Sequence, residues 1–166
     1  MKDADFLALA QALIEACAIR GVSLATAESC TGGLVGASLT AVPGASRVYL
    51  GGVVSYANAV KQGVLGVPEA VLAQEGAVSA PCARAMALGA QRALGARLAL
   101  ATTGIAGPGS DGTDKPVGLV YAAAALDGAA VVEKHLFAGD RESVRAQTVR
   151  AVLDLALRCL EQKVSN

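Results

Sequence analysis

The chain has 166 residues with a formal net charge of zero, and 54% of them are hydrophobic against 17% charged. This length most simply forms one domain, residues 1–166, with a sizeable core. Balanced charge offers no basic field for nucleic acid or anionic lipid, and no window reaches the ~18 uninterrupted apolar residues of a membrane span, so we expect neither partner.

The first half of the sequence predicts alternating helices and strands. Apolar residues at helical spacing predict a helix over residues 5–20. A buried strand over residues 22–27 and a helix over residues 32–39 follow. Residues 47–56 then predict a strand with a bulge or a close backbone approach at Gly51-Gly52, because glycine inside a strand usually marks one of these features.

The second half predicts further helices and a hairpin. In chain order we expect a short helix capped by Asn58, a helical turn from Pro68 to near Gly76, a helix over residues 81–94, a strand over residues 98–102, strands over residues 117–126 and 129–137, and a last helix capped by Asp140. Asp127-Gly128 predicts that the last two strands form an antiparallel hairpin. This order predicts an α/β fold, a three-layer α/β/α sandwich with a mixed, mostly parallel sheet and one antiparallel hairpin.

Residues 27–33 lie where the first strand should pass into the second helix. The first amide N–H groups of a helix lack intrahelical partners, so they can bind an anion or a developing oxyanion. Ser29 and Cys30 on this turn are two possible nucleophiles, and a thiol is the more reactive type at neutral pH. A capping role is the alternative, because serine before a helix caps amides more often than it performs chemistry.

Few side chains could activate either nucleophile. His135, the only histidine, falls inside a predicted hairpin strand away from the strand-end loops, so a Ser-His-Asp triad is not expected. The four cysteines are widely spaced without a Cys-x-x-Cys pair. This spacing argues against a metal site and for reduced thiols in a cytoplasm, and the acidic start of the chain does not resemble a secretion signal.

A lysine is the remaining type of base, provided that burial or neighbouring positive charge lowers its pKa from about 10.4. Lys61 follows the second strand close to Tyr56, among small and apolar neighbours, and is the better-placed candidate. Lys115 lies in a loop rich in glycine and proline, where a solvated charge is the default interpretation. The other lysines, near the termini or in the hairpin, are Lys2, Lys134 and Lys163.

The loop over residues 103–116 contains a formal G-x-G-x-x-G match at residues 107–112. Pro116 and Gly118 prevent the helix that must follow in a dinucleotide site, so we expect no cofactor. The backbone amides of this loop suit a small polar ligand instead, with neighbouring threonine hydroxyls as donors.

Two arginines at the start of the last helix are further candidates. Arg141 and Arg145 stand four residues apart, so they share a helix face and could clamp a phosphate. Surface ion pairs with Asp140 or Glu142 are the commoner explanation for such arginines.

Taken together, the chain resembles the CinA C-terminal domain family, the stand-alone nicotinamide-nucleotide amidases. The resemblance covers nearly the whole chain and rests on ordered blocks, each weak alone but specific as a set. The blocks are Thr26-Ala27-Glu28-Ser29-Cys30-Thr31-Gly32-Gly33, Ser55-Tyr56-Ala57-Asn58 with Lys61, Gly76-Ala77-Val78-Ser79, Thr103-Gly104-Ile105-Ala106-Gly107-Pro108, Lys115-Pro116-Val117-Gly118 and Gly139-Asp140-Arg141.

The resemblance implies hydrolysis of the carboxamide of nicotinamide mononucleotide, giving nicotinate mononucleotide and ammonia without a metal. It implies a Ser-Lys mechanism carried by Ser29 and Lys61, with Tyr56 nearby. Amides around Thr31, Gly32 and Gly33 would hold the oxyanion, and the 103–116 loop and the two arginines would hold the ribose phosphate. The expected substrate contacts are Thr31, Gly32, Gly33, Thr103, Gly104, Ile105, Ala106, Arg141 and Arg145.

A non-catalytic module that binds a nucleotide or a partner, with a regulatory role in competence or DNA damage, is the alternative function. The family is often fused to an amino-terminal domain with pyrophosphatase activity, and we assign none of that chemistry to these residues. An alanine-rich chain with few charges also favours a homo-oligomer.

Overall fold

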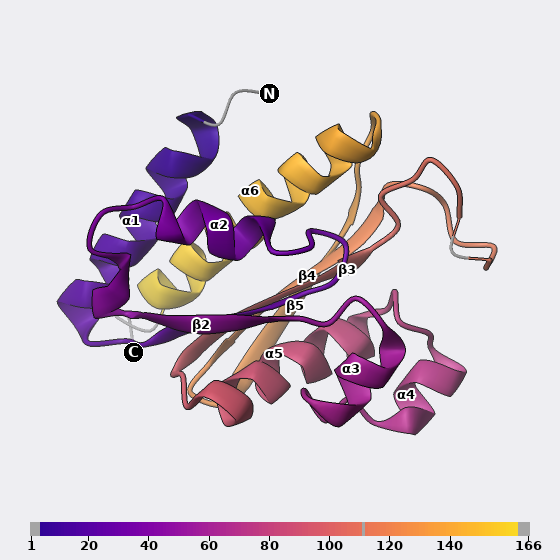
Figure 1. Cartoon of the computed structure of the whole chain (residues 1–166), viewed down its shortest axis with the longest axis horizontal. Helices are drawn as coiled ribbons and strands as arrows, with labels where there is room; N and C mark the ends of the chain where they lie inside the picture. The colour runs from indigo at the N-terminus through magenta and orange to yellow at the C-terminus, as the bar shows by residue number, and fades with distance from the viewer. Residues whose placement is uncertain (1–3, 111, 163–166) are drawn as a thin grey trace.

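Five β-strands form one mixed sheet, and helices cover both of its faces (Figure 1). The computed structural model describes residues 4–110 and 112–162, so Lys2 and Lys163 lie outside the described residues. The elements in chain order are α1 (Ala4–Arg20), β1 (Leu24–Glu28), α2 (Leu34–Thr40), a short 3-10 helix (Ala45–Arg47), β2 (Tyr49–Val54), α3 (Asn58–Gly63), α4 (Glu69–Gln74), α5 (Ala80–Leu94), β3 (Leu98–Gly104), β4 (Leu119–Leu126), β5 (Ala129–Leu136) and α6 (Arg141–Gln162).

The strands lie in the order β2-β1-β3-β4-β5. β1 pairs in parallel with β2 and β3, whereas β4 pairs antiparallel with both β3 and β5. Four strands therefore run in one direction and β4 runs against them. The predicted mixed sheet and hairpin are confirmed, but the pairings divide into two parallel and two antiparallel. The second antiparallel pairing arises because a loop, and not a crossover helix, joins β3 to β4.

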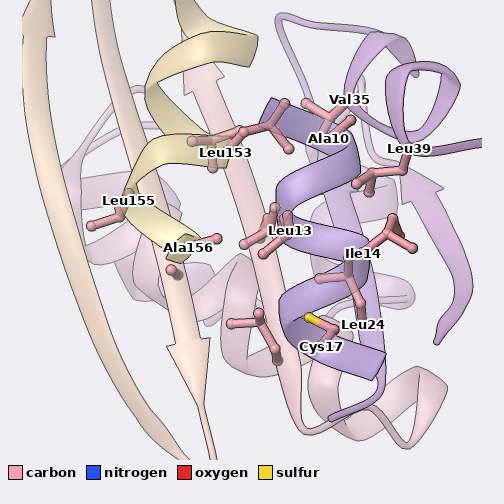
Figure 2. Close-up of a cluster of buried hydrophobic side chains, with 14 of the residues drawn as sticks. Ala10, Leu13, Ile14, Cys17, Leu24, Val35, Leu39, Leu153, Leu155 and Ala156 are labelled. Atoms are coloured by element: carbon pink, nitrogen blue, oxygen red, sulfur yellow. The ribbon is translucent and has the colours of Figure 1, made fainter. Parts of the chain in front are cut away.

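The helices form the two outer layers of the predicted sandwich. α1, α2 and α6 cover one face of the sheet, and α3, α4 and α5 lie on the other (Figure 1). Figure 2 shows Leu13 and Ile14 of α1 packed with Leu39 of α2 and Leu153 of α6, against Leu24 of β1. All five side chains are fully buried, so this apolar contact fixes β1 and α2, the two elements that flank Ser29.

Glycines and alanines let the opposite layer approach closely. Residues 122–125 of β4 are four consecutive buried alanines. On α5, a Cβ added at Gly89 would clash with the carbonyl group of Leu65. Because Leu65 follows α3 directly, this close approach holds α3 and its residue Lys61 against α5.

The glycine pair in β2 has both predicted features. β2 advances from Tyr49 to Gly51 while β1 advances by one residue, which is the predicted bulge. A Cβ at Gly52 would clash with the hydroxyl of Thr26, so the backbone approach is also close there.

Local signals in the sequence predicted one turn and one helix cap correctly and another cap wrongly. Asp127 and Gly128 have φ values of 49° and 86°, as the two-residue hairpin requires. The Asp140 carboxylate caps α6 by accepting the amide N–H of Ser143 at 2.8 Å. The predicted Asn58 cap is wrong, because Ala57 holds the extended N-cap position of α3 without a side-chain hydrogen bond.

Within residues 4–110 and 112–162, no helix combines the length and apolar character needed to cross a bilayer. The same residues contain no cluster of three or more histidine, cysteine or acidic side chains arranged to hold a metal ion.

Candidate active site

A cavity of about 400 Å³ lies at the edge of the sheet where β1, β2 and β3 end. Ser29 directly follows β1, Lys61 lies on α3 after β2, and Thr103 and Gly104 are the last residues of β3, and all four line the cavity. Parallel strands place their carboxyl ends together, so residues far apart in the sequence meet at this edge.

The Lys61 side chain is buried at the cavity wall, with 1% of the residue exposed. Its Nζ lies 3.0 Å from Ser29 Oγ, 2.7 Å from the carbonyl oxygen of Ser55 and 3.2 Å from that of Tyr56. Desolvation by burial lowers the pKa of Lys61 below its ordinary value of 10.5, and thiol groups nearby oppose this only weakly. No carboxylate of the described residues forms an ion pair with it.

This geometry suits proton transfer from Ser29 to Lys61. A neutral amine has two N–H bonds and one lone pair. The carbonyls of Ser55 and Tyr56 can accept both N–H bonds, which leaves the lone pair to accept the proton of the Ser29 hydroxyl. The arrangement can therefore activate Ser29 as a nucleophile.

Cys30 also lines the cavity, but its thiol is poorly suited to be the nucleophile. The residue is 5% exposed, and desolvation raises the pKa of Cys30 to about 12. Because the thiolate is the nucleophilic form, a thiol that stays protonated at neutral pH is inert. Of the two neighbours, the half-buried Ser29 is the one that contacts a base.

Glu28, which sequence reasoning missed, organises the Ser29 turn from the side opposite the cavity. Its carboxylate is buried and accepts the Thr31 hydroxyl at 2.6 Å. It also accepts the amide N–H groups of Gly33, Val35 and Gly36 at 3.0, 3.0 and 2.8 Å. The available signal in the sequence was an acidic residue at the end of an apolar strand, because a buried acid is rare unless it is paired.

Glu28 corrects the predicted set of oxyanion donors. The amide of Gly33 is already donated to Glu28, and the amide of Gly32 is donated to the carbonyl of Ser29 at 3.1 Å. Among the described residues, no backbone carbonyl accepts the amide N–H groups of Cys30 and Thr31. Of the predicted donors, the amide of Thr31 therefore stays available, and the amide of Cys30, immediately after the nucleophile, joins it.

Thr31 is a predicted substrate contact whose side chain faces away from the cavity. The residue is completely buried, and its hydroxyl lies 2.7 Å from that of Thr102 as well as bonding to Glu28. Only its backbone amide remains available for a substrate.

The structure separates the two predicted phosphate-binding arginines. Arg141 lines the cavity and donates to the Gly107 carbonyl at 2.9 Å and to the Tyr56 hydroxyl at 3.2 Å. Arg145 does not line the cavity and instead donates to the carbonyl of Thr31 at 2.8 Å. Arg145 therefore supports the Ser29 turn, which the shared helix face could not reveal.

Tyr56 lies at the cavity, but its phenol contacts neither Ser29 nor Lys61. The ring is 62% exposed, and the hydroxyl pairs with Arg141. Its backbone carbonyl is the group that contacts Lys61. Tyr56 therefore lies close to Lys61 through its backbone, whereas its side chain contacts Arg141.

The loop after β3 contributes some of its predicted residues. Thr103, Gly104 and Ala106 line the cavity, with the Thr103 hydroxyl donating to the Ala77 carbonyl at 2.7 Å. Ile105 is not among the lining residues, because its side chain packs in a small apolar cluster with Val78 and Leu119. Its substrate contact stays a prediction.

Lys115 also lines the cavity, contrary to the interpretation as a solvated charge. Its ammonium donates to the carbonyls of Glu75 and Val78, each at 2.7 Å. These partners are 40 and 37 residues away in the sequence, so no local pattern could predict the contacts.

The sheet order and this cavity define an α/β/α protein with a ligand-sized site at the carboxyl edge of its parallel strands. The family model of the CinA C-terminal domain matches residues 7–160. The chain belongs to the CinA C-terminal domain family, as its sequence blocks predicted.

Relatives and solved structures agree with this assignment. The chain is 50% identical to a CinA-like protein of Geobacter sulfurreducens over 85% of its length, and 48% identical to a putative competence-damage inducible protein of Desulforamulus reducens over 92%. It spans about a third of these relatives, 34% and 36%. A CinA superfamily protein from Klebsiella pneumoniae matches with a TM-score of 0.92 and 35% identity, covering 95% of this chain and 98% of that one. The competence/damage inducible protein CihA from Agrobacterium tumefaciens matches with a TM-score of 0.89 and 40% identity, covering 95% and 96%.

Proposed function

We propose that the chain is an amidohydrolase that converts nicotinamide mononucleotide to nicotinate mononucleotide and ammonia. The observation that carries the proposal is the buried Lys61 amine, held by two carbonyls at 3.0 Å from Ser29 Oγ on the wall of the cavity. The Ser-Lys geometry supports the reaction type, and the family resemblance supports the choice of substrate.

The first half of the reaction forms an acyl-enzyme. Neutral Lys61 accepts the Ser29 proton while Ser29 Oγ attacks the carboxamide carbon. The amide N–H groups of Cys30 and Thr31 stabilise the negative charge that develops on the carboxamide oxygen. Protonated Lys61 then donates its proton to the departing nitrogen, and ammonia leaves.

The second half hydrolyses the ester on Ser29. Lys61, neutral again, takes a proton from water as the water oxygen attacks the acyl carbon, and it returns that proton to Ser29 Oγ as the ester bond breaks. The product is the nucleotide carboxylate. Thr103, Gly104 and Arg141 line the same cavity and would position the nucleotide.

Ammonia release from nicotinamide mononucleotide tests the proposal. Ser29→Ala and Lys61→Ala should each abolish release while circular dichroism and chromatographic behaviour stay unchanged. His135→Ala serves as the control, because His135 stacks on Phe137 outside the cavity and should keep full activity. An active Ser29→Ala protein would contradict the mechanism. An unmodified chain that binds the nucleotide but releases no ammonia would favour the non-catalytic binding module.

A further inference from the structure

The cavity wall has a one-sided charge. Among the described residues that line it, none is aspartate or glutamate, and three are basic: Lys61, Lys115 and Arg141. Lys61 contacts Ser29 and has a lowered pKa, so it is assigned to proton transfer. The permanent positive charge of the cavity therefore comes from Lys115 and Arg141, and such a surface favours an anionic ligand.

Lys115 is the cation that the fold holds most firmly in this wall. The Glu75 and Val78 carbonyls fix its ammonium, each at 2.7 Å. An ammonium has three N–H donors, and no acceptor of the described residues takes the third. No carboxylate of the described residues pairs with Lys115. Val78 also precedes the start of α5 by two residues, so the positive end of that helix dipole adds to the same region.

Two of the other places that the sequence suggested for an anion are already occupied. The first amides of α2 donate to the buried Glu28 carboxylate, which would repel a second negative charge. Arg145 donates to the Thr31 carbonyl and does not line the cavity. Arg141 lines the cavity and donates one N–H from each terminal nitrogen, to Gly107 and to Tyr56, so its remaining N–H groups could add a bond beside that of Lys115.

We infer that Lys115 is a specificity-determining residue that binds the phosphate monoester of a mononucleotide substrate. This inference rests on the proposed function, because it assigns the anionic end of the substrate within the same cavity. Lys115 forms a charge-assisted hydrogen bond to a phosphate oxygen while its two carbonyl contacts keep the ammonium in place. The phosphate end of the nucleotide therefore lies toward the loop that precedes β4, and the carboxamide lies at Ser29.

The test compares nicotinamide mononucleotide with nicotinamide riboside, which has the same carboxamide but no phosphate. Lys115→Met should lower kcat/KM for the mononucleotide by about 10- to 100-fold, mainly through KM, because one charge-assisted bond is lost. Turnover of the riboside should stay within about 2-fold of the unmodified protein. Lys115→Arg should recover part of the loss, and Lys134→Met, an exposed lysine of the hairpin, is the matched control that should change neither substrate.

Two results would overturn the inference. An equal loss on both substrates would show that Lys115 only braces the loop through Glu75 and Val78. An unchanged preference for the mononucleotide in Lys115→Met, with the preference lost in Arg141→Met, would assign the phosphate to Arg141 instead.

Calorimetry separates failure of the inference from failure of the proposed function. If the unmodified chain releases no ammonia, the two compounds can still be titrated into it and into Lys115→Met. If Lys115→Met then binds the mononucleotide more weakly but the riboside equally well, the phosphate site is supported although the amidase activity is not. A chain that binds neither compound, or binds both equally well, would overturn the phosphate site too.

Discussion

The parallel and antiparallel halves of the sheet contribute differently to the cavity. In the parallel half, β1, β2 and β3 end at one edge, and the residues at or just after their ends include Ser29, Lys61 and Thr103. In the antiparallel half, the Asp127-Gly128 turn lies at the opposite edge, because the end of β4 pairs with the start of β3. His135 lies on the outer strand β5 and does not line the cavity.

This difference shows how topology, and not residue type, selects the functional groups. The single histidine is chemically the obvious base, but the fold places it on an edge strand beside Glu133. A lysine becomes usable because the parallel half buries it next to a serine. The antiparallel half frames the site, and after β5 the chain returns to the cavity at Arg141.

Replacing the lysine of each half should give the largest contrast. Lys61→Met should lower kcat for ammonia release by at least about 10³-fold, because the proton of Ser29 loses its acceptor. Lys134→Met in the hairpin should change kcat by less than 2-fold. Steady-state ammonia assays measure both, and similar losses in the two variants would remove the functional distinction between the halves.

The burial of Lys61 also predicts the sign of a pH effect. Its pKa lies below 10.5 in the folded protein, so kcat/KM should rise with pH as the amine loses its proton and level off below pH 10.5. The unfolded chain binds this proton more tightly, so the Lys61 contribution to unfolding free energy should increase with pH between the lowered pKa and 10.5. Activity and urea unfolding measured across that range test both statements. A kcat/KM that falls with rising pH throughout would exclude Lys61 as a general base.

Glu28→Gln should weaken the Ser29 turn from behind the cavity. The uncharged amide would turn an N–H group toward the donors that now bond to the carboxylate, so we expect a loss of about 2–4 kcal/mol in unfolding free energy. We also expect kcat to fall by about 10- to 100-fold, because misplaced amides of Cys30 and Thr31 bind the oxyanion less well. Urea denaturation and ammonia release measure the two effects, and unchanged values would show that the turn does not depend on Glu28.

Much of the fold followed from local sequence signals. Helical spacing, the Asp127-Gly128 turn and the Gly51-Gly52 pair each depend on nearby residues, and the structure contains all three features. The two-residue turn needs positive φ, which Asp and Gly tolerate. The second antiparallel pairing was not predicted, because a long loop between β3 and β4 does not reveal the direction in which the chain returns.

The candidate site was only partly predictable for the same reason. Ser29 and Lys61 were paired by eliminating other bases and by the expected meeting of strand ends, and their contact at 3.0 Å agrees with that argument. The role of Glu28 was missed, and Lys115 was interpreted as a solvated charge, because both roles depend on where backbone groups of other segments lie. The position of Arg145 behind the turn likewise depends on the rotation of α6.

Cys30→Ala should have a small effect. The thiol has a pKa of about 12, so it is protonated throughout the neutral range and contributes no nucleophile. We expect kcat/KM within about 3-fold of the unmodified protein, with the remaining change due to packing at the cavity wall. Ammonia assays measure this, and a loss as large as that of Lys61→Met would point to thiol chemistry.

The proposal that Ser29 is the nucleophile is tested most directly by identifying the residue that carries the acyl group. The protein is mixed with nicotinamide mononucleotide, quenched with acid and digested, and the peptides are analysed by mass spectrometry. We expect a nicotinate-nucleotide ester on Ser29 that persists in Cys30→Ala and is missing in Ser29→Ala. A thioester on Cys30, or full ammonia release by Ser29→Ala, would contradict it.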